Sequence, residues 1–221
     1  MPIISHTYRA AIFDLDGTLI DSLEDLADSA NAMLESYGFP THPVEPYKYF
    51  VGNGSRKLIE RCLPKEQASD PAFVDEALER YKHIYGQHTQ DKTHVYNGIM
   101  EMLNELKKRN IPMGICTNKH QSAAEDIVSA MFPAGTFQSI MGDQKGLPRK
   151  PDPKKVLMIA DSFHVAPKEV AYFGDTSVDM DTAKNAGFLA IGVLWGFRPK
   201  EELVEHGADV LLETPMELFA H

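Results

Sequence analysis

Two aspartates stand two positions apart, directly after a short apolar run near the start of the chain. Asp14 and Asp16 follow residues 10–13, and a Gly-Thr pair comes straight after them. In an extended strand, positions i and i+2 project to the same side, so the two carboxylates can converge on one point. Adjacent negative charges repel unless they share a cation or a proton. The pattern therefore favours a chemically active strand end over an ordinary acidic turn.

Three further groups along the chain combine the same kinds of side chain. Thr117-Asn118 separates an apolar run from a helical pattern, where these residues can bind an anion or simply cap the helix. Lys150 lies in Lys-Pro-Asp-Pro, whose prolines restrict the backbone around it, although a lone lysine is ordinarily solvated. Asp175 follows another apolar run, and Asp179 comes four residues later, where it can also serve as a first-turn helix acid.

The segments that must position these residues alternate between strand and helix patterns from Val95 onward. Helices are predicted at 98–110, after Lys119, and at 153–163, and strands at 111–116, 137–141, 170–173, 189–194 and 209–212. Such alternation predicts an α/β fold with a parallel sheet wound by helices. Ligands of open α/β sheets bind at the carboxyl ends of the strands, where most of these polar groups fall.

Residues 21–92 break this alternation, because no convincing strand is found in them. Helical spacing of apolar residues predicts helices from Asp21 or Ser22 to about Tyr37, at 55–63, and around 73–85. Gly38 and three prolines, at positions 40, 43 and 46, predict a loop between the first two. A helical block is therefore inserted directly behind the first pair of aspartates.

Composition excludes several classes of protein. A net charge of −10 argues against a nucleic-acid partner, whose binders usually carry a basic stripe. Cys62 and Cys116 match no zinc-site spacing and predict no disulfide framework. Residues 1–8 lack the pattern of a signal peptide, and no apolar run is as long as a membrane span. We therefore expect a cytoplasmic protein without a membrane partner.

Taken together, Asp-x-Asp-Gly-Thr, Thr-Asn, Lys-Pro and Gly-Asp-x-x-x-Asp occur in an order that closely resembles the haloacid dehalogenase-like hydrolase superfamily. The resemblance implies a Rossmann-like α/β core at 1–20 and 93–221, with a small α-helical cap at 21–92. Val51-Gly52-Asn53-Gly54 and Val193-Leu194-Trp195-Gly196-Phe197 are similar to the phosphoglycolate phosphatase branch.

The superfamily resemblance also implies roles for the acidic residues. Asp14 would attack phosphorus and form an aspartyl-phosphate, and Asp16 would protonate the leaving group and later activate water. Mg²⁺ would be held by Asp14, the backbone carbonyl of Asp16, and Asp175. Asp179 would orient waters or Lys150 rather than bind the metal.

The same resemblance implies a phosphate site and a specificity loop. Thr117 and the backbone amide of Asn118 would hold the transferring oxygens, and Lys150 would neutralise charge shared with the nucleophile. In the cap, Gly52, Asn53, Gly54 and Arg56 would favour a small acidic leaving group such as glycolate, although the alternative of an ordinary glycine turn remains.

Several alternatives stay open at this point. The substrate, a small phosphorylated metabolite, could instead be a sugar phosphate, a nucleotide or pyrophosphate, and the sequence separates a β-phosphoglucomutase-like mutase from a hydrolase poorly. Asp16 argues against a dehalogenase, which typically lacks a second aspartate there. No cap lysine has a persuasive setting for a phosphonoacetaldehyde hydrolase. The helical insertion disfavours a receiver-like phospho-Asp switch. We expect a monomer or a homodimer.

Overall fold

The structure is a computed structural model, and it describes residues 8–220. Residues 1–7 and 221 lie outside the described residues. The prediction that residues 1–8 form no signal peptide falls largely on them, and so do the two ends of the core predicted at 1–20 and 93–221. Among residues 8–220, no helix combines the length and apolar character that a membrane crossing requires.

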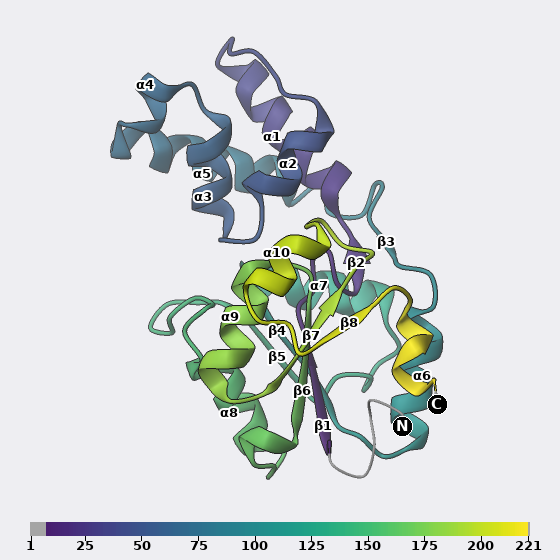
Figure 1. The fold of residues 1–221 in the computed structure, drawn as a ribbon. Coiled ribbons are helices and arrows are strands. Elements are labelled where there is room, and N and C mark those ends of the chain that lie inside the picture. Colours follow the sequence, from purple (N-terminus) through teal and green to yellow (C-terminus); the bar gives the residue numbers. More distant parts are fainter. Residues whose placement is uncertain (1–7, 221) are drawn as a thin grey trace.

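A six-stranded parallel sheet forms the lower part of the molecule in Figure 1, in the strand order β5-β4-β1-β6-β7-β8. The order places the first strand of the chain in the middle, between β4 and β6. The six strands are β1 (Ala10–Phe13), β4 (Met113–His120), β5 (Ser139–Asp143), β6 (Val170–Gly174), β7 (Leu189–Val193) and β8 (Val210–Leu212). This arrangement confirms the predicted α/β fold with a parallel sheet.

Helices cover both faces of this sheet. Alternate residues of the strands point to opposite faces, and because the residues on both faces are apolar, each face is buried by helices. Ala11 and Phe13 of β1 pack with α6, α7 and the C-terminal 3-10 helix η2, whereas Ala10 and Ile12 pack with α8, α9 and α10. These elements are α6 (Ile99–Lys108), α7 (Gln121–Met131), α8 (Lys154–Ser162), η1 (Pro167–Glu169), α9 (Ser177–Ala186), α10 (Lys200–Glu205) and η2 (Pro215–Phe219).

A separate helical group lies above the carboxyl ends of the strands (Figure 1). Its members are α1 (Leu23–Ser36), α2 (Val44–Phe50), α3 (Ser55–Cys62), α4 (Lys65–Ala68) and α5 (Pro71–Tyr85). They bury their own apolar cluster, which includes Met33, Leu34, Ile59 and Tyr81. The helical group joins the sheet through a two-stranded antiparallel ribbon of β2 (Ile20–Asp21) and β3 (His94–Val95).

Asp25 ties the two connections between the helical group and the sheet together. Its buried carboxylate accepts hydrogen bonds from the backbone amides of Lys92 and Thr93 and, at 2.6 Å, from the Thr93 hydroxyl. The entry of the chain into the helical group is thereby fixed beside its exit.

Two local predictions were wrong. The prolines at 43 and 46 do not keep 44–50 in a loop, because Pro43 directly precedes α2 and Pro46 lies in its first turn, where no intrahelical amide bond is lost. The fourth strand also does not end at Cys116 but runs to His120, with an irregularity in its pairing to β5 between those two residues. Thr117 and Asn118 therefore lie within a strand, and α7 begins only at Gln121.

Candidate active site

Asp14 lies at the centre of the site because β1 is the central strand and ends one residue before it. The backbone amide of Asp14 donates to Phe173 O on β6 at 2.9 Å, which extends the strand pairing by one residue. Its side chain is buried, and Oδ1 lies 2.9 Å from Lys150 Nζ while accepting no well-aligned hydrogen bond from the described residues.

Three buried carboxylates meet at this strand end. Asp14, Asp175 and Asp179 each place an oxygen within 4.8 Å of the others. Asp175 follows β6, the neighbour of β1, and Asp179 lies in the first turn of α9. Adjacent parallel strands ending at one sheet edge thus bring together side chains that are 161 residues apart in sequence.

Asp175 is fixed through both of its oxygens. Thr18 Oγ1 donates to Oδ1 at 3.0 Å, and the Phe197 amide donates to Oδ2 at 2.9 Å. Burial, followed by repulsion from Asp179 and Asp14, raises the pKa of Asp175 well above its ordinary value.

Lys150 is the cation of the cluster. Its Nζ lies 2.7 Å from Asp179 Oδ1 and 3.2 Å from the Tyr172 hydroxyl, and its side chain is buried. Burial alone would lower the pKa of Lys150, but Asp14 and Asp179 together raise it. Both oxygens of Asp179 accept hydrogen bonds, since Oδ2 takes the Thr176 amide and hydroxyl. This is consistent with the prediction that Asp179 orients Lys150 rather than binding metal.

The donor set of the cluster suits a divalent metal ion. Three carboxylates against one lysine leave two negative charges uncompensated in a buried place when all are ionised. Burial and the charge of Asp179 raise the pKa of Asp14 to about 7, although Lys150 opposes them. Carboxylate oxygens are the ligands that hard cations such as Mg²⁺ prefer, and a divalent charge would counter both causes of the raised pKa.

Asp16 faces the same cleft as Asp14, but its carboxylate has different partners. Ser22 Oγ donates to Oδ1 at 2.6 Å, and Lys119 Nζ lies 2.9 Å from Oδ1 and 3.2 Å from Oδ2. The two carboxylates therefore do not converge on one cation, because β1 ends at Phe13 and the chain turns between them. That the backbone carbonyl of Asp16 binds the metal stays a prediction.

Thr117 and Asn118 lie beside the cluster, where β4 adjoins β1. Thr117 Oγ1 accepts from the Lys119 amide at 3.1 Å, and the buried Lys155 donates to the Thr117 carbonyl at 3.0 Å. The Asn118 side chain joins three segments: its Oδ1 accepts from the Lys150 amide, and its Nδ2 donates to the carbonyls of Lys150 and Gly52.

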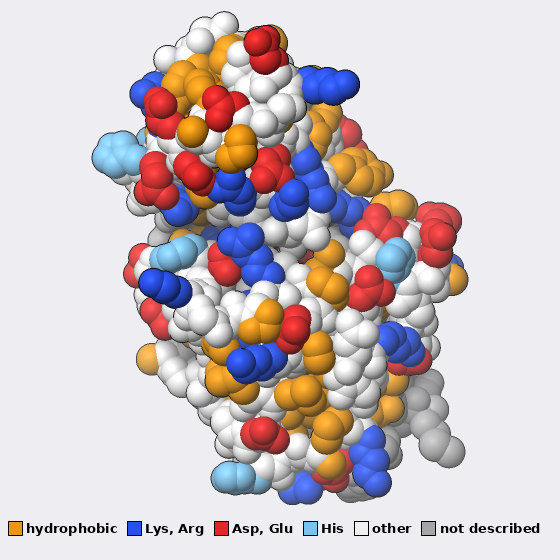
Figure 2. Space-filling model, turned by 90° about the vertical axis from the view of Figure 1, so that its left-hand side faces the viewer, with side chains coloured by type: hydrophobic (Ala, Val, Ile, Leu, Met, Phe, Trp, Pro, Cys, Tyr) orange, Lys and Arg blue, Asp and Glu red, His pale blue; other side chains and the backbone are white. Residues whose placement is uncertain are grey.

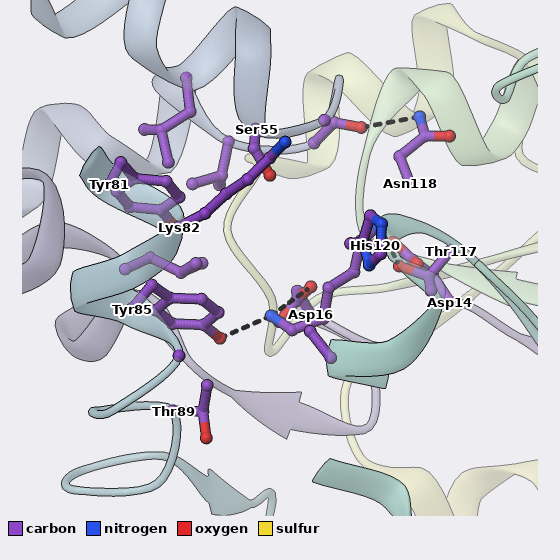
Figure 3. Close-up of a pocket in the computed structure, with 18 of the residues that line it drawn as sticks. Asp14, Asp16, Ser55, Tyr81, Lys82, Tyr85, Thr89, Thr117, Asn118 and His120 are labelled. Carbon is purple, nitrogen blue, oxygen red and sulfur yellow. Dashed lines mark hydrogen bonds and ion pairs between the residues drawn. The ribbon is translucent and has the colours of Figure 1, made fainter. Parts of the chain in front are cut away.

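A cleft of about 320 Å³ separates the carboxyl ends of the strands from the helical group (Figure 3). The space-filling view shows Lys and Arg side chains gathered on one face where the two parts meet (Figure 2). The side chains that line the cleft are polar toward the sheet, with Asp14, Asp16 and Thr117, and largely apolar toward the helices, with Leu26, Leu58 and Tyr81.

Two of the four predicted specificity residues lie at this cleft. Gly52 and Gly54 line it, both with positive φ, and the Gly52 carbonyl accepts from Asn118. Asn53 instead accepts from Arg61, and Arg56 pairs with Glu60 and Asp75 along the helices. A specificity role for Asn53 and Arg56 stays a prediction that no contact with the cleft supports among the described residues.

Sequence reasoning missed three residues at the site. Lys119 pairs with Asp16, Tyr85 accepts a hydrogen bond from Lys119, and Tyr172 accepts one from Lys150. Lys119 directly follows Thr117-Asn118, so its position was a usable signal. Tyr85 and Tyr172 carried no signal, because each appeared as one apolar position in a helix or strand pattern.

Comparison with known proteins places this arrangement in a family. The sequence model of the family of haloacid dehalogenase-like hydrolases matches residues 11–193, a range that includes Asp14, Lys150 and Asp179. The chain belongs to this family. Its resemblance to the superfamily, stated above from four motifs, is thereby confirmed, and the chain is an enzyme of the hydrolase class.

Relatives within the haloacid dehalogenase-like hydrolases agree on a branch. The phosphoglycolate phosphatase of Xanthomonas campestris pv. campestris is 33% identical, over 96% of this chain and 95% of that protein. The phosphoglycolate phosphatase of Pseudomonas putida is 31% identical, over 94% and 74% respectively. A solved haloacid dehalogenase-like hydrolase from Streptococcus pneumoniae superposes with a TM-score of 0.86 at 26% identity, over 97% of this chain and 98% of that one. The resemblance to the phosphoglycolate phosphatase branch is thus confirmed.

Proposed function

We propose that the chain is a Mg²⁺-dependent phosphatase that forms an aspartyl-phosphate on Asp14, with 2-phosphoglycolate as its substrate. The observation that carries the proposal is the buried Asp14 carboxylate, ion-paired to Lys150 and clustered with Asp175 at the floor of the cleft. Relatives at 31–33% identity that are named phosphoglycolate phosphatases support the choice of substrate.

The metal would be held by the carboxylates of Asp14 and Asp175 and by the backbone carbonyl of Asp16. Bound there, Mg²⁺ supplies positive charge that offsets the repulsion between the phosphate and the carboxylates. Thr18 and the Phe197 amide hold Asp175 in place for this task.

The chain's own residues would perform the chemistry in two steps. A carboxylate oxygen of Asp14 attacks phosphorus, the bond to the leaving oxygen breaks, and Asp16 gives that oxygen a proton. Water then attacks phosphorus of the aspartyl-phosphate and gives a proton to Asp16, the bond from phosphorus to the Asp14 oxygen breaks, and inorganic phosphate leaves. Lys150, Thr117 and the Asn118 amide would stabilise the charge on the transferring oxygens.

The helical group would act as a cap over the cleft and exclude water from the reaction. We propose the division made from the sequence, with a core at 1–20 and 93–221 and a cap at 21–92. A cytoplasmic location and a monomeric or homodimeric state likewise stay predictions.

A second candidate substrate is a larger phosphoester, such as a sugar phosphate. A cleft of about 320 Å³ lies at the lower end of small-molecule sites, and its apolar side includes Leu26, Leu58 and Tyr81. This lining suits a leaving group with more carbon surface than glycolate has.

A survey of kcat/KM with Mg²⁺ tests both candidates, using 2-phosphoglycolate, hexose phosphates, nucleotides, pyrophosphate and phosphonoacetaldehyde. Release of inorganic phosphate separates a hydrolase from a mutase, which would return an isomeric phosphoester. Asp14→Asn should abolish turnover and the acid-stable, base-labile phosphoenzyme. Normal turnover by that variant, with reversion by deamidation excluded by mass spectrometry, would refute the proposal.

A further inference from the structure

Lys119 links the helical group to the sheet through one side chain. It lies near the end of β4, and its Nζ donates to the Tyr85 hydroxyl at 2.6 Å while it also pairs with Asp16. Tyr85 is the last residue of α5, on the opposite side of the cleft (Figure 3). The same Nζ lies 4.7 Å from the centre of the Tyr85 ring.

The link is enclosed, which distinguishes it from an ordinary surface ion pair. The Lys119 side chain is 6% exposed and that of Asp16 is 18% exposed. Exposed pairs contribute little, whereas buried and hydrogen-bonded pairs fix geometry. Lys82, another lysine that lines the cleft, differs in this respect, because it is 44% exposed and pairs with Glu79 on its own helix.

Asp16 has few ways to move while this link exists. Its carboxylate is held by the Ser22 hydroxyl on one side and by the Lys119 ammonium on the other. Two of the three Lys119 donors point to partners from different parts of the fold, so the position of Nζ depends on where α5 lies above the sheet.

We propose that Lys119 and Tyr85 together position Asp16 for proton transfer, and that they do so only when the helical group lies over the cleft. The inference rests on the proposed function and adds two positioning residues to it. In the step concerned, the bond from phosphorus to the leaving oxygen breaks as one forms to Asp14, and the Asp16 proton passes to the leaving oxygen. Lys119 and Tyr85 neither gain nor lose a proton.

The leaving group provides the test, because a poor leaving group needs the acid and a good one does not. Lys119→Met should lower kcat/KM for 2-phosphoglycolate about 100-fold, near the lower limit for losing a general acid. For p-nitrophenyl phosphate, the loss should stay below about tenfold, since its phenolate leaves without a full proton transfer. Lys119→Arg, which keeps the charge, should recover part of the activity on 2-phosphoglycolate.

Tyr85→Phe removes only the hydroxyl, and a double-mutant cycle tests whether it acts through Lys119. The double variant should be no slower on 2-phosphoglycolate than Lys119→Met alone, because Tyr85 then has nothing left to position. Two matched controls remove similar groups far from the cleft: Lys184→Met breaks a surface pair with Asp209, and Tyr37→Phe breaks a hydrogen bond to Glu76. Both controls should keep full activity, and thermal unfolding should show that every variant folds.

Three results would overturn the inference. Equal losses on the two esters in Lys119→Met would mean that Lys119 serves folding or binding rather than Asp16. Additive losses in the double variant would mean that Tyr85 acts on its own. Wild-type protein that hydrolyses no phosphoester would refute the proposed function and this inference with it, whereas the first two results leave the proposed function intact.

Discussion

Replacing Gly17 by alanine should disable the site while barely changing the rest of the molecule. Gly17 has a φ of +85°, and a Cβ built on it would lie 2.3 Å from Asp175 Oδ2 and 2.6 Å from Asp175 Cγ. Real Cβ atoms essentially never come closer than 3.0 Å, so the Asp175 carboxylate would have to move by at least 0.7 Å. That movement strains its hydrogen bonds from Thr18 and Phe197.

The magnitude follows from this displacement. Misplacing a reacting or ligating group by about 1 Å can cost about 100-fold in rate, which corresponds to about 2.7 kcal/mol of activation free energy. The left-handed backbone also costs about 1–2 kcal/mol of stability, which lowers the free energy of unfolding, because alanine adopts this conformation poorly. For a chain of this size, that cost should lower Tm by about 2–8 °C.

Gly38→Ala is the matched control, since Gly38 has a φ of +73° and its Cβ would meet nothing within 4 Å. Both variants should lose stability through the backbone, but only Gly17→Ala should lose kcat about 100-fold at saturating Mg²⁺. Metal binding has its own readout in the single tryptophan, Trp195, whose indole donates to the Thr18 carbonyl at 2.9 Å. Equal kcat values in the two variants, with unchanged Mg²⁺ titrations of Trp195 fluorescence, would refute the reasoning.

Three further predictions concern charge and burial. Mg²⁺ at 100 times its Kd should stabilise the fold by about 2.7 kcal/mol and raise Tm by about 5–10 °C in calorimetry, and an Asp175→Asn variant that shows the same rise would contradict the proposed metal site. Burial raises the pKa of Cys62 to about 12 and that of Cys116 to about 11, so both thiols should resist a disulfide reagent in the native protein and react on unfolding. Rapid modification of the native protein would count against the packing. A hydrogen bond to Asp181 raises the pKa of His206, so its contribution to stability should be full below the unfolded pKa of about 6.5 and be lost as pH rises through the higher folded pKa. The Tm difference between wild type and His206→Gln should accordingly shrink from pH 6 to pH 9, and a constant difference would argue against the ion pair.

The sequence indicated the sheet well because buried parallel strands have a simple pattern. Runs such as Val170–Gly174 are apolar on both faces and end at a polar residue, so strand ends and site residues could be predicted together. The pattern failed at α2, where two prolines suggested a loop although both are compatible with a helix start. It also failed at the end of β4, where polar residues continue the strand past Cys116.

Most of the predicted site residues lie at or beside one cleft, but some of the predicted cap residues point away from it. Asp14, Lys150, Asp175 and Asp179 form one buried cluster, with Thr117 and Asn118 beside it. Among the cap residues, Gly52 and Gly54 line the cleft, whereas the Arg56 side chain pairs along the helices. Arg56 follows a glycine loop in sequence, but its direction depends on how α3 packs against α5.

The sequence by itself determined which chemical groups this protein has and that they stand at strand ends. The spacing of the aspartates could not determine that Asp175 rather than the side chain of Asp16 would lie against Asp14, and only the resemblance to the superfamily implied it. That outcome depends on β1 pairing with β6 in the register that aligns Phe13 with Phe173, and strand order is a property of the packed sheet. Tertiary structure likewise decided that Lys119 and Tyr85, 34 residues apart, meet over Asp16. The physical reason is that a hydrogen bond needs atoms within about 3 Å, whereas a sequence pattern fixes only the face of an element on which a side chain lies.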